Sequence, residues 1–350
     1  MSVKGGQVVP QGGGVRVNVG GLLTTEILEQ AQGVTTYRGH RPEDGSAQVI
    51  KTIAAAKLGA TARARLDYEV EVLNQEVAAA VHLGTDGPLV FVARPFLSGV
   101  TLENRLTHGS LPAADVVSLA ITIIGALTHI HPRGVLHRGI KPSNVILGDG
   151  RADSAHLVDF GLTGFLRIMA GLDEQSLFAA EHLSPEQSGL IDTAIDARSD
   201  LYSVGVLMYE ALAGRPPFSG QTVGEVLRHH LTTRPPALAT FAPDVPPALD
   251  RIIERLLSKD PRDRYQTAGG ALADLEVVAA ALAAGVPDPE LIVGARDVRA
   301  ALTEPAFIGR TEELATIDQV VARAAMGDGG LILVEGESGQ GKTWLLAELS

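Results

Sequence analysis

Cysteine is absent from this chain of 350 residues, and aromatic residues make up only 4% of it. The absence of cysteine excludes disulfide bonds, cysteine metal sites and thiol catalysis. The first residues, MSVKGGQVVPQGGG, lack the apolar core of a signal peptide. The most apolar helical stretch that the sequence predicts, Val277 to Val286, is too short to cross a bilayer. These absences predict a soluble cytoplasmic protein that does not enter a membrane.

Basic charge is also in short supply, because 29 Lys and Arg face 41 Asp and Glu, which gives a formal net charge of −12. Such an acidic balance argues against binding to nucleic acid or to an anionic membrane surface. Hydrophobic residues, in contrast, reach 45% of the composition. The chain is therefore apolar enough to bury a sizeable core, and long enough for about two domains of ~150 residues each.

The predicted secondary structure changes along the chain. Strand-like runs dominate the first hundred residues, and a helical pattern over residues 60–81 interrupts them. The predicted strands are Val34–Tyr37, Ala47–Lys51 and Leu89–Ala93. Helices are then expected over residues 113–131, 198–213, 223–231, 247–258 and 268–284. A strand-rich part followed by a helix-rich part predicts a two-lobed α+β domain with a cleft between its lobes.

Glycine and proline mark the boundaries of this domain. Residues 1–20 are glycine-rich and are predicted to form a flexible tail. The two-lobed domain is expected over residues 21–285, and a linker with proline and charged residues over residues 286–305. A second unit is expected to occupy residues 306–350.

The most informative stretch is His-Arg-Gly-Ile-Lys-Pro-Ser-Asn at residues 137–144, which precedes Asp159-Phe160-Gly161 by fifteen residues. It resembles the catalytic and metal-binding loops of the protein kinase family, most closely those of bacterial serine/threonine kinases. In that family the catalytic loop has the pattern H-R-D-x-x-x-x-N, whose aspartate accepts the proton of the substrate hydroxyl. Gly139 occupies the position of that aspartate, and glycine has no side chain that could accept a proton.

The resemblance implies a set of residues that bind ATP and Mg2+. Lys51 matches the lysine that binds the α- and β-phosphates. Lys141 matches the lysine that contacts the transferred phosphoryl group. Asn144 and Asp159 match the two protein ligands of magnesium, since hard cations take oxygen ligands.

Three further features of the first lobe bear on nucleotide binding. The ion-pair partner of Lys51 is expected to be Glu69, with Glu71 as the alternative because the motif does not determine the register of this helix. The phosphate-covering loop should have the pattern G-x-G-x-x-G, but only Gly33 remains of it. Backbone amides would therefore approach the phosphates less closely. Arg94 falls near the position that gates the adenine site, where it would either narrow the site or reach a phosphate.

Other matches imply roles in the fold of the domain. The Ser-Pro-Glu segment that ends at Glu186 is similar to the A-P-E segment that closes the activation loop of kinases. Arg264 resembles the arginine that pairs with this glutamate, and Asp200 resembles the buried aspartate that braces the catalytic loop. The residues with a structural role implied by the resemblance are His137, Arg138, Glu186, Asp200 and Arg264.

A second departure accompanies the loss of the aspartate. The Gly-Thr pair that precedes the A-P-E segment in kinases appears here as Phe178-Ala179, so the threonine that bonds the catalytic aspartate is missing too. A positioned general base contributes typically ~10² to 10⁴ in rate, and its removal would raise the barrier by roughly 3 to 5.5 kcal/mol. Three hypotheses follow: a pseudokinase that binds ATP and regulates an attached ATPase, a slow serine/threonine kinase that acts on a protein substrate, and a scaffold that binds no nucleotide.

A second nucleotide-binding motif lies near residue 340. A short apolar strand, Leu331–Val334, precedes G-E-S-G-Q-G-K-T, which is a full match to the P-loop pattern. Residues 307–314 resemble the start of AAA-like ATPase modules of the STAND type, which extend well beyond a P-loop. We therefore expect the front part of a longer bacterial signalling protein, with ATPase and sensor domains downstream. The P-loop residues expected to hold phosphate and magnesium are Gly336, Gly341, Lys342 and Thr343.

Overall fold

The computed structural model describes residues 17–31, 33–77, 80–160, 177–191 and 193–297, together with positions 320 and 323. The chain forms two compact units. The first contains Met1–Gly59 and Ala78–Phe96, and the second contains Ala60–Val77 and Leu97–Ser350. Several predicted features lie outside the described residues: Gly161, residues 307–314, and the P-loop with Gly336, Gly341, Lys342 and Thr343.

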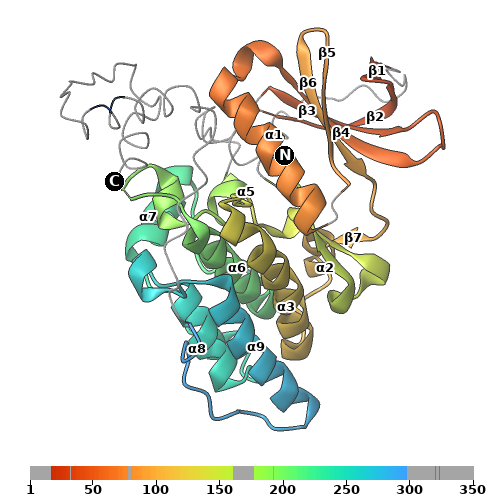
Figure 1. The fold of residues 1–350 in the computed structure, drawn as a ribbon. Helices are drawn as coiled ribbons and strands as arrows, with labels where there is room; N and C mark the ends of the chain where they lie inside the picture. The colour runs from red at the N-terminus through yellow and green to blue at the C-terminus, as the bar shows by residue number, and fades with distance from the viewer. Residues whose placement is uncertain are drawn as a thin grey trace, which may run out of the picture. The chain divides into compact units, whose positions relative to one another are not determined.

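The first unit contains a six-stranded sheet in the order β1-β2-β3-β4-β6-β5, in which all neighbouring strands are antiparallel (Figure 1). The three predicted strands are confirmed as parts of β3, β4 and β6. Strand β1 lies within the segment predicted to be a flexible tail, so that prediction is wrong for its last residues. The strands are β1 (Asn18–Val19), β2 (Leu22–Ala31), β3 (Val34–His40), β4 (Ala47–Ala54), β5 (His82–Asp86) and β6 (Leu89–Pro95).

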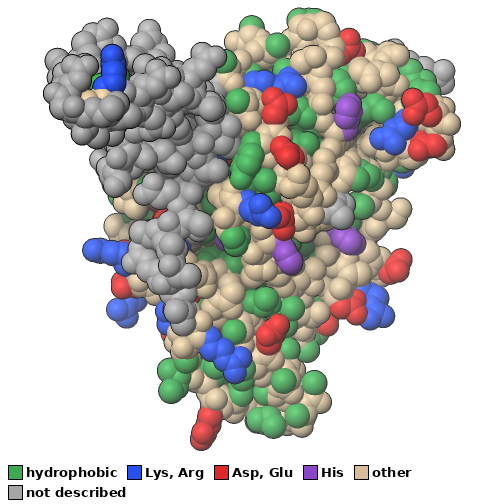
Figure 2. Space-filling view, viewed as in Figure 1, with side chains coloured by type: hydrophobic (Ala, Val, Ile, Leu, Met, Phe, Trp, Pro, Cys, Tyr) green, Lys and Arg blue, Asp and Glu red, His purple; other side chains and the backbone are tan. Residues whose placement is uncertain are grey.

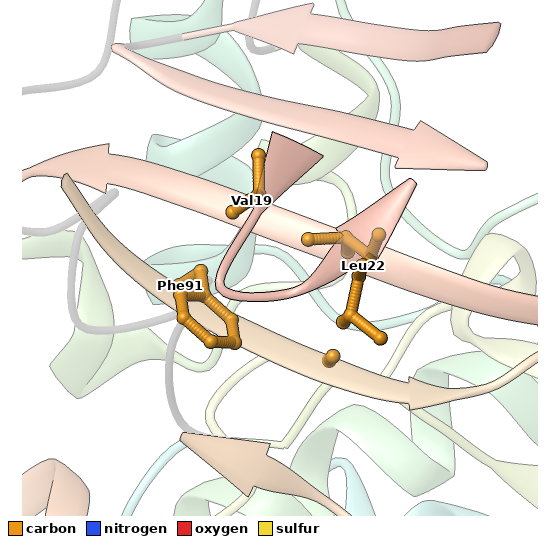
Figure 3. Close-up of a cluster of buried hydrophobic side chains, with 5 residues drawn as sticks. Val19, Leu22 and Phe91 are labelled. Atoms are coloured by element: carbon orange, nitrogen blue, oxygen red, sulfur yellow. The ribbon is translucent and has the colours of Figure 1, made fainter. Parts of the chain in front are cut away.

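A small apolar cluster attaches β1 to the sheet. Val19, Leu22, Ile50, Phe91 and Ala93 are all buried and contact one another (Figure 3). The Phe91 ring needs glycine on two sides, because a Cβ atom would lie 2.1 Å from the ring at position 20 and 2.4 Å from it at position 84. Burial of such side chains contributes about 1.5 to 3 kcal/mol each, which explains why β1 is held against the sheet.

The second unit is mostly helical and also holds a three-stranded sheet in the order β7-β8-β9 (Figure 1). Five of its helices coincide with predicted ones to within two residues at each end, and α1 ends earlier than expected, before β5 begins at His82. Its elements are α1 (Ala60–Glu76), β7 (Val100–Thr101), α2 (Leu102–Leu106), α3 (Ala113–Ile130), β8 (Val145–Leu147), β9 (Ala155–Leu157), α5 (Leu177–Ala180), α6 (Ala197–Ala213), α7 (Val223–Thr232), α8 (Pro247–Leu256) and α9 (Ala268–Ala283).

Helix α3 is the core helix of this unit and packs against α6 and α9. Its buried residues include Val116, Leu119, Ile123 and Leu127, which recur every three to four positions along one face. By length and composition alone, the stretch Ala113–Arg133 could also cross a bilayer. The predicted stretch Val277 to Val286 is therefore not the helix that meets this criterion of length and composition.

Charged side chains of both signs share the described surface. Figure 2 shows acidic and basic side chains interspersed on one face. Some of them pair along one element, such as Arg63 with Asp67 at 3.2 Å. Acidic charge is therefore not gathered into a single patch on the face shown.

Candidate functional site

The backbone of the loop that contains Gly139 is hydrogen-bonded to one buried carboxylate. Asp200, in the first turn of α6, accepts hydrogen bonds from the backbone N–H groups of His137 and Arg138, both at 2.8 Å. A third donor is Nε2 of His131, at 3.0 Å. The Asp200 side chain is buried, and the sequence predicts this bracing role for it. The geometry therefore matches the predicted role, because three donors converge on one carboxylate.

The surroundings of Asp200 stabilise its charged form. Burial by itself would raise the pKa of this carboxyl, but the hydrogen bond and charge of His131, the charge of His137 and the backbone donors outweigh it. The pKa of Asp200 consequently lies below its ordinary value. The carboxylate remains ionised at neutral pH and continues to accept all three bonds.

The His137 ring connects this loop to the segment that carries Asp159. Its Nε2–H group donates to the Val158 carbonyl at 3.0 Å, and its Nδ1 accepts from the Gly139 N–H at 3.2 Å. The ring also makes an edge contact with Phe160, with the ring centres 4.6 Å apart. Burial lowers the pKa of His137, so the imidazole is neutral and both hydrogen bonds persist. His137 is thus a packed loop residue, as its sequence position implies.

Gly139 leaves open the space that a catalytic side chain would fill. Among the described residues, a Cβ atom at this position would meet only Asn144 Nδ2 at 3.7 Å and His137 Nδ1 at 3.9 Å. Both are ordinary contacts, and the Gly139 backbone is not among the left-handed ones. No carboxylate of the described residues lies within 4 Å of that point. Neither sterics nor backbone conformation therefore requires glycine here.

Asn144 holds the same loop from its other end. The Nδ2 group of its side chain donates to the Gly139 carbonyl at 2.8 Å, and its backbone carbonyl accepts from the Val158 N–H at 2.9 Å. The two residues expected to bind magnesium, Asn144 and Asp159, are therefore on segments that are hydrogen-bonded to each other. Lys141, three residues before Asn144, lies in the same loop and is half-buried.

Two non-glycine residues of the site have left-handed backbones. Arg138 has φ of 60° and Asp159 has φ of 67°. Such conformations cost of order 1–3 kcal/mol each and persist only where the surroundings impose them. Arg138 is held by its N–H bond to Asp200 and by Gln187, whose Nε2 donates to the Arg138 carbonyl at 3.2 Å. These contacts therefore hold the loop in a backbone conformation that costs folding free energy.

Gln187 belongs to the turn that follows α5. Ser184 and Gln187 form a capping box, in which the Gln187 side chain accepts from the Ser184 N–H at 3.0 Å. Because its amide also donates to the Arg138 carbonyl, Gln187 connects this turn to the loop at residues 137–144. Sequence reasoning missed this residue, although a glutamine three positions after Ser184 is the signal of such a box.

The predicted pairing of Glu186 with Arg264 is present. The guanidinium binds both carboxylate oxygens, at 2.7 and 3.0 Å, and both side chains are almost fully buried. Ser199 donates to the same carboxylate at 2.6 Å. Arg264 further donates to the carbonyls of Ser258 and Lys259. The guanidinium thus donates five hydrogen bonds and both oxygens of Glu186 accept at least one, which a buried pair needs to offset its desolvation.

A buried histidine supports the same part of the second unit. His230, on α7, accepts from the Tyr202 hydroxyl at 2.8 Å through Nδ1 and donates to the Glu181 carbonyl at 3.1 Å through Nε2. Burial, and then the charge of Lys259, lower the pKa of His230 to about 3. Neutral His230 therefore connects Tyr202 of α6 to the turn that begins near Glu181.

We expect acid to weaken the second unit between pH 6.5 and 5. The folded pKa values of His137 and His230 lie below the unfolded value of about 6.5, so the unfolded chain takes up protons that the folded chain does not. His230 alone should account for ~2 kcal/mol over this interval. Urea unfolding at both pH values measures the loss. His230→Gln should flatten the pH dependence, and His108→Gln, at an exposed position, should leave it unchanged; equal slopes in both variants would contradict the assignment.

Of the two glutamates left open on α1, Glu69 is buried and Glu71 is exposed. The Glu69 carboxylate accepts from Arg65 at 2.9 Å and from Arg138 at 3.4 Å. Glu71 instead accepts from the Gln75 side chain at 3.0 Å. Glu69 therefore faces the interior of the second unit and contacts the catalytic loop through Arg138.

The remaining nucleotide-binding candidates lie in the first unit. Lys51 is buried in β4, between Thr36 of β3 and Val92 of β6. Gly33 forms the turn between β2 and β3 with φ of 79°, a conformation that favours glycine. Arg94 is half-buried in β6. In the second unit, Phe178 and Ala179 lie in α5, and Ala179 is buried.

Comparisons with known proteins agree with this geometry. Residues 30–273 match the protein kinase domain family. The chain is 35% identical over 232 residues to the serine/threonine-protein kinase PknL of Mycobacterium tuberculosis, covering 65% of this chain and 55% of that protein. It is 34% identical over 194 residues to the serine/threonine-protein kinase PknB of Mycolicibacterium smegmatis, covering 54% and 30%. The chain thus spans about half, or less, of the length of these relatives.

The fold has solved counterparts. The PknI kinase domain of Mycobacterium tuberculosis has a TM-score of 0.54 and 23% identity, with 77% of this chain and 98% of that chain covered. At this level of identity the likeness concerns the fold.

Proposed function

Because the chain belongs to the protein kinase family, of the bacterial serine/threonine type, we propose that it binds Mg-ATP and is strongly impaired in phosphoryl transfer. The observation that carries this proposal is the absence of a side chain at Gly139, in a loop whose backbone is hydrogen-bonded to Asp200, His137 and Asn144. No carboxylate of the described residues lies within 4 Å of the point where a side chain would begin. The neutral, doubly hydrogen-bonded His137 is a poor substitute for the missing base.

The resemblance to kinases assigns roles in nucleotide binding to four residues. Lys51 would bind the α- and β-phosphates, and Lys141 would contact the γ-phosphate. Asn144 and Asp159 would bind Mg2+, which needs few protein ligands because phosphates and water complete its shell. Among the described residues there is no cluster of three or more acidic or histidine ligands, so a metal would depend on the phosphates of the nucleotide.

ATP with Mg2+ is expected to raise the thermal unfolding midpoint of the full chain. Ligand at a hundred times its Kd stabilises the folded state by about 2.7 kcal/mol. Asp159→Asn should remove the part of this shift that depends on Mg2+, because it removes a charged ligand while asparagine tolerates the left-handed backbone. Differential scanning fluorimetry with and without Mg2+ measures both effects.

Asp149→Asn is the matched control for this experiment. Asp149 is also a left-handed aspartate, with φ of 51°, but it is exposed. Its substitution should leave the magnesium-dependent shift intact. A magnesium response that survives Asp159→Asn would exclude the proposed metal ligand, and the absence of any shift with ATP in the unchanged protein would favour the scaffold hypothesis.

A second candidate function is an active serine/threonine kinase that transfers the γ-phosphate of ATP to a protein. The retained left-handed backbones of Arg138 and Asp159 favour it, because these conformations cost stability and belong to the loops that would hold ATP and metal. Incubation with labelled ATP distinguishes the two: autophosphorylation at the rate of ordinary protein kinases would replace the pseudokinase proposal. Regulation of an ATPase formed by residues 306–350 and the chain beyond, with downstream sensor domains, stays a prediction from the sequence, as does a cytoplasmic location.

A further inference from the structure

The segment after α9 is bound to the second unit along its length. It runs from the end of α9 back toward α8 (Figure 1). The Ala248 N–H donates to the Asp288 side chain at 2.8 Å, and Arg255 Nη1 donates to the Val293 carbonyl at 2.9 Å. The sequence predicts a linker for residues 286–305. The first part of this linker, Asp288–Asp297, is called the docked segment below.

Asp297 is the main anchor of the docked segment. Its side chain is only 1% exposed, which is unusual for a linker aspartate. It accepts from the backbone N–H groups of Gln266 and Thr267 at 2.8 and 3.1 Å, and from the Thr267 hydroxyl at 3.1 Å. Arg255 adds an ion pair at 3.2 Å. Because Thr267 caps α9, this carboxylate also lies at the positive end of a helix dipole.

A second anchor involves Gly294. Its N–H donates at 2.6 Å to Asp274, which also accepts from the Tyr265 hydroxyl at 2.6 Å. Burial, and then the hydrogen bond to Asp274, raise the pKa of Tyr265, so the hydroxyl keeps its proton and continues to donate. The Arg255 guanidinium lies over the Tyr265 ring, 4.7 Å from its centre. Charged and aromatic groups of α8, α9 and the loop between them therefore surround the docked segment.

Two glycines make the close approach possible. A Cβ atom on Gly270 of α9 would lie 2.5 Å from Asp297 Oδ1 and 2.8 Å from its Cα. A Cβ atom on Gly294 would lie 2.0 Å from Arg255 Nη1, and its φ of 77° is left-handed. At the adjacent Gly269, no atom of the described part of the chain lies within 4 Å of the Cβ position. Gly270 on α9 therefore leaves the space that Asp297 occupies, and Gly294 in the docked segment leaves the space that Arg255 occupies.

Hydrogen bonds link the docked segment to residues that support the candidate site. Gln266, whose N–H bonds Asp297, accepts from Arg198 Nη1 at 3.1 Å and donates to the Arg264 carbonyl at 2.8 Å. Arg264 in turn binds Glu186, one residue before Gln187 and its contact with the catalytic loop. A series of hydrogen bonds through Gln266, Arg264 and Glu186 therefore connects Asp297 to the turn at residues 184–187.

We propose that Arg255, Tyr265, Thr267, Gly270 and Asp274 form an intramolecular binding site whose ligand is the chain's own segment Asp288–Asp297. The segment occupies this site in the folded protein, so the packed part of the second unit continues past the end of α9 as far as Asp297. Recognition depends on specific groups. The buried carboxylate of Asp297 binds the N-terminus of α9 and Arg255, and the Gly294 N–H binds Asp274. Nothing in this proposal depends on nucleotide binding.

Amide hydrogen exchange of the full chain tests the proposal with Gly270→Ala and Gly269→Ala. Both variants add one methyl group at neighbouring positions of α9, but only the first collides with Asp297. Gly270→Ala should raise exchange in residues 288–297 at least ~10-fold, because opening of the segment becomes easier while the core stays closed. Gly269→Ala should leave the exchange of these residues unchanged.

A second variant approaches the site from the other side. Asp297→Asn removes the charge that binds Arg255 and Thr267 without adding volume, and it should raise exchange in the same residues. Exchange in α3 and α6 reports on the whole fold in every variant. Unchanged exchange of residues 288–297 in both Gly270→Ala and Asp297→Asn would overturn the proposal, and so would a rise of equal size in α3 and α6.

Discussion

Gly139→Asp is expected to raise phosphoryl transfer by ~10²- to 10⁴-fold over the unchanged protein, which is the usual contribution of a positioned general base. The Cβ of the new side chain causes no clash, because among the described residues it would meet only Asn144 Nδ2 and His137 Nδ1 at 3.7 and 3.9 Å. The loop needs no rearrangement, because Asp200, His137 and Asn144 already fix its backbone. Autophosphorylation with labelled ATP under single-turnover conditions measures the gain.

Gly139→Asn is the matched control, because asparagine has nearly the same shape as aspartate but cannot accept the proton in the same way. It should leave the rate near that of the unchanged protein. A gain of equal size in both variants would mean that loop rigidity, and not a base, limits transfer. If ATP binds and neither variant gains, the limiting defect lies elsewhere, and Ala179→Thr added to Gly139→Asp then tests the second departure from the family.

Arg264→Ala is expected to destabilise the second unit by about 3–5 kcal/mol, because it leaves the Glu186 carboxylate buried without its counter-charge. The variant also removes donors to the carbonyls of Ser258, Lys259 and Arg198. Chemical unfolding monitored by circular dichroism measures the loss. Arg264→Lys should recover only part of it, since an ammonium cannot bind both oxygens of Glu186 in the fork geometry.

Arg262 offers a control only two residues away. It pairs with Asp260, but its side chain is 81% exposed. Arg262→Ala should leave the unfolding midpoint unchanged, because exposed ion pairs contribute little. If Arg264→Ala proved as mild as Arg262→Ala, the Glu186–Arg264 pair would not be the brace that its burial indicates.

Local patterns predict the fold well where one physical requirement repeats along the chain. The apolar period of three to four residues in α3 is visible in Val116, Leu119 and Ile123, and a helix with that stripe has to bury it. The resemblance to kinases likewise implies the role of Asp200 and the pairing of Glu186 with Arg264. These residues could be found because the resemblance covers the segments on which they lie.

Contacts that depend on distant residues have no such signal. The bonds of His131 to Asp200 and of Gln187 to Arg138 join positions about 69 and 49 residues apart, and no periodicity links them. The docked segment is the clearest case, because residues 288–297 have the proline, glycine and charge of an ordinary linker. Its attachment depends on Gly270 and Arg255, whose suitability is visible only when the helices are in place.

The docked segment also changes how the protein would respond to tension. Asp297 is bound at Thr267, the N-terminal cap of α9, so the chain returns to the start of the helix it has just left. Helix α9, ~24 Å long at 1.5 Å per residue, therefore lies inside a closed loop. A pull on the chain beyond residue 297 would be borne by Arg255, Gln266 and Thr267 and would bypass α9, so the polar anchors would have to part before the helix could unwind.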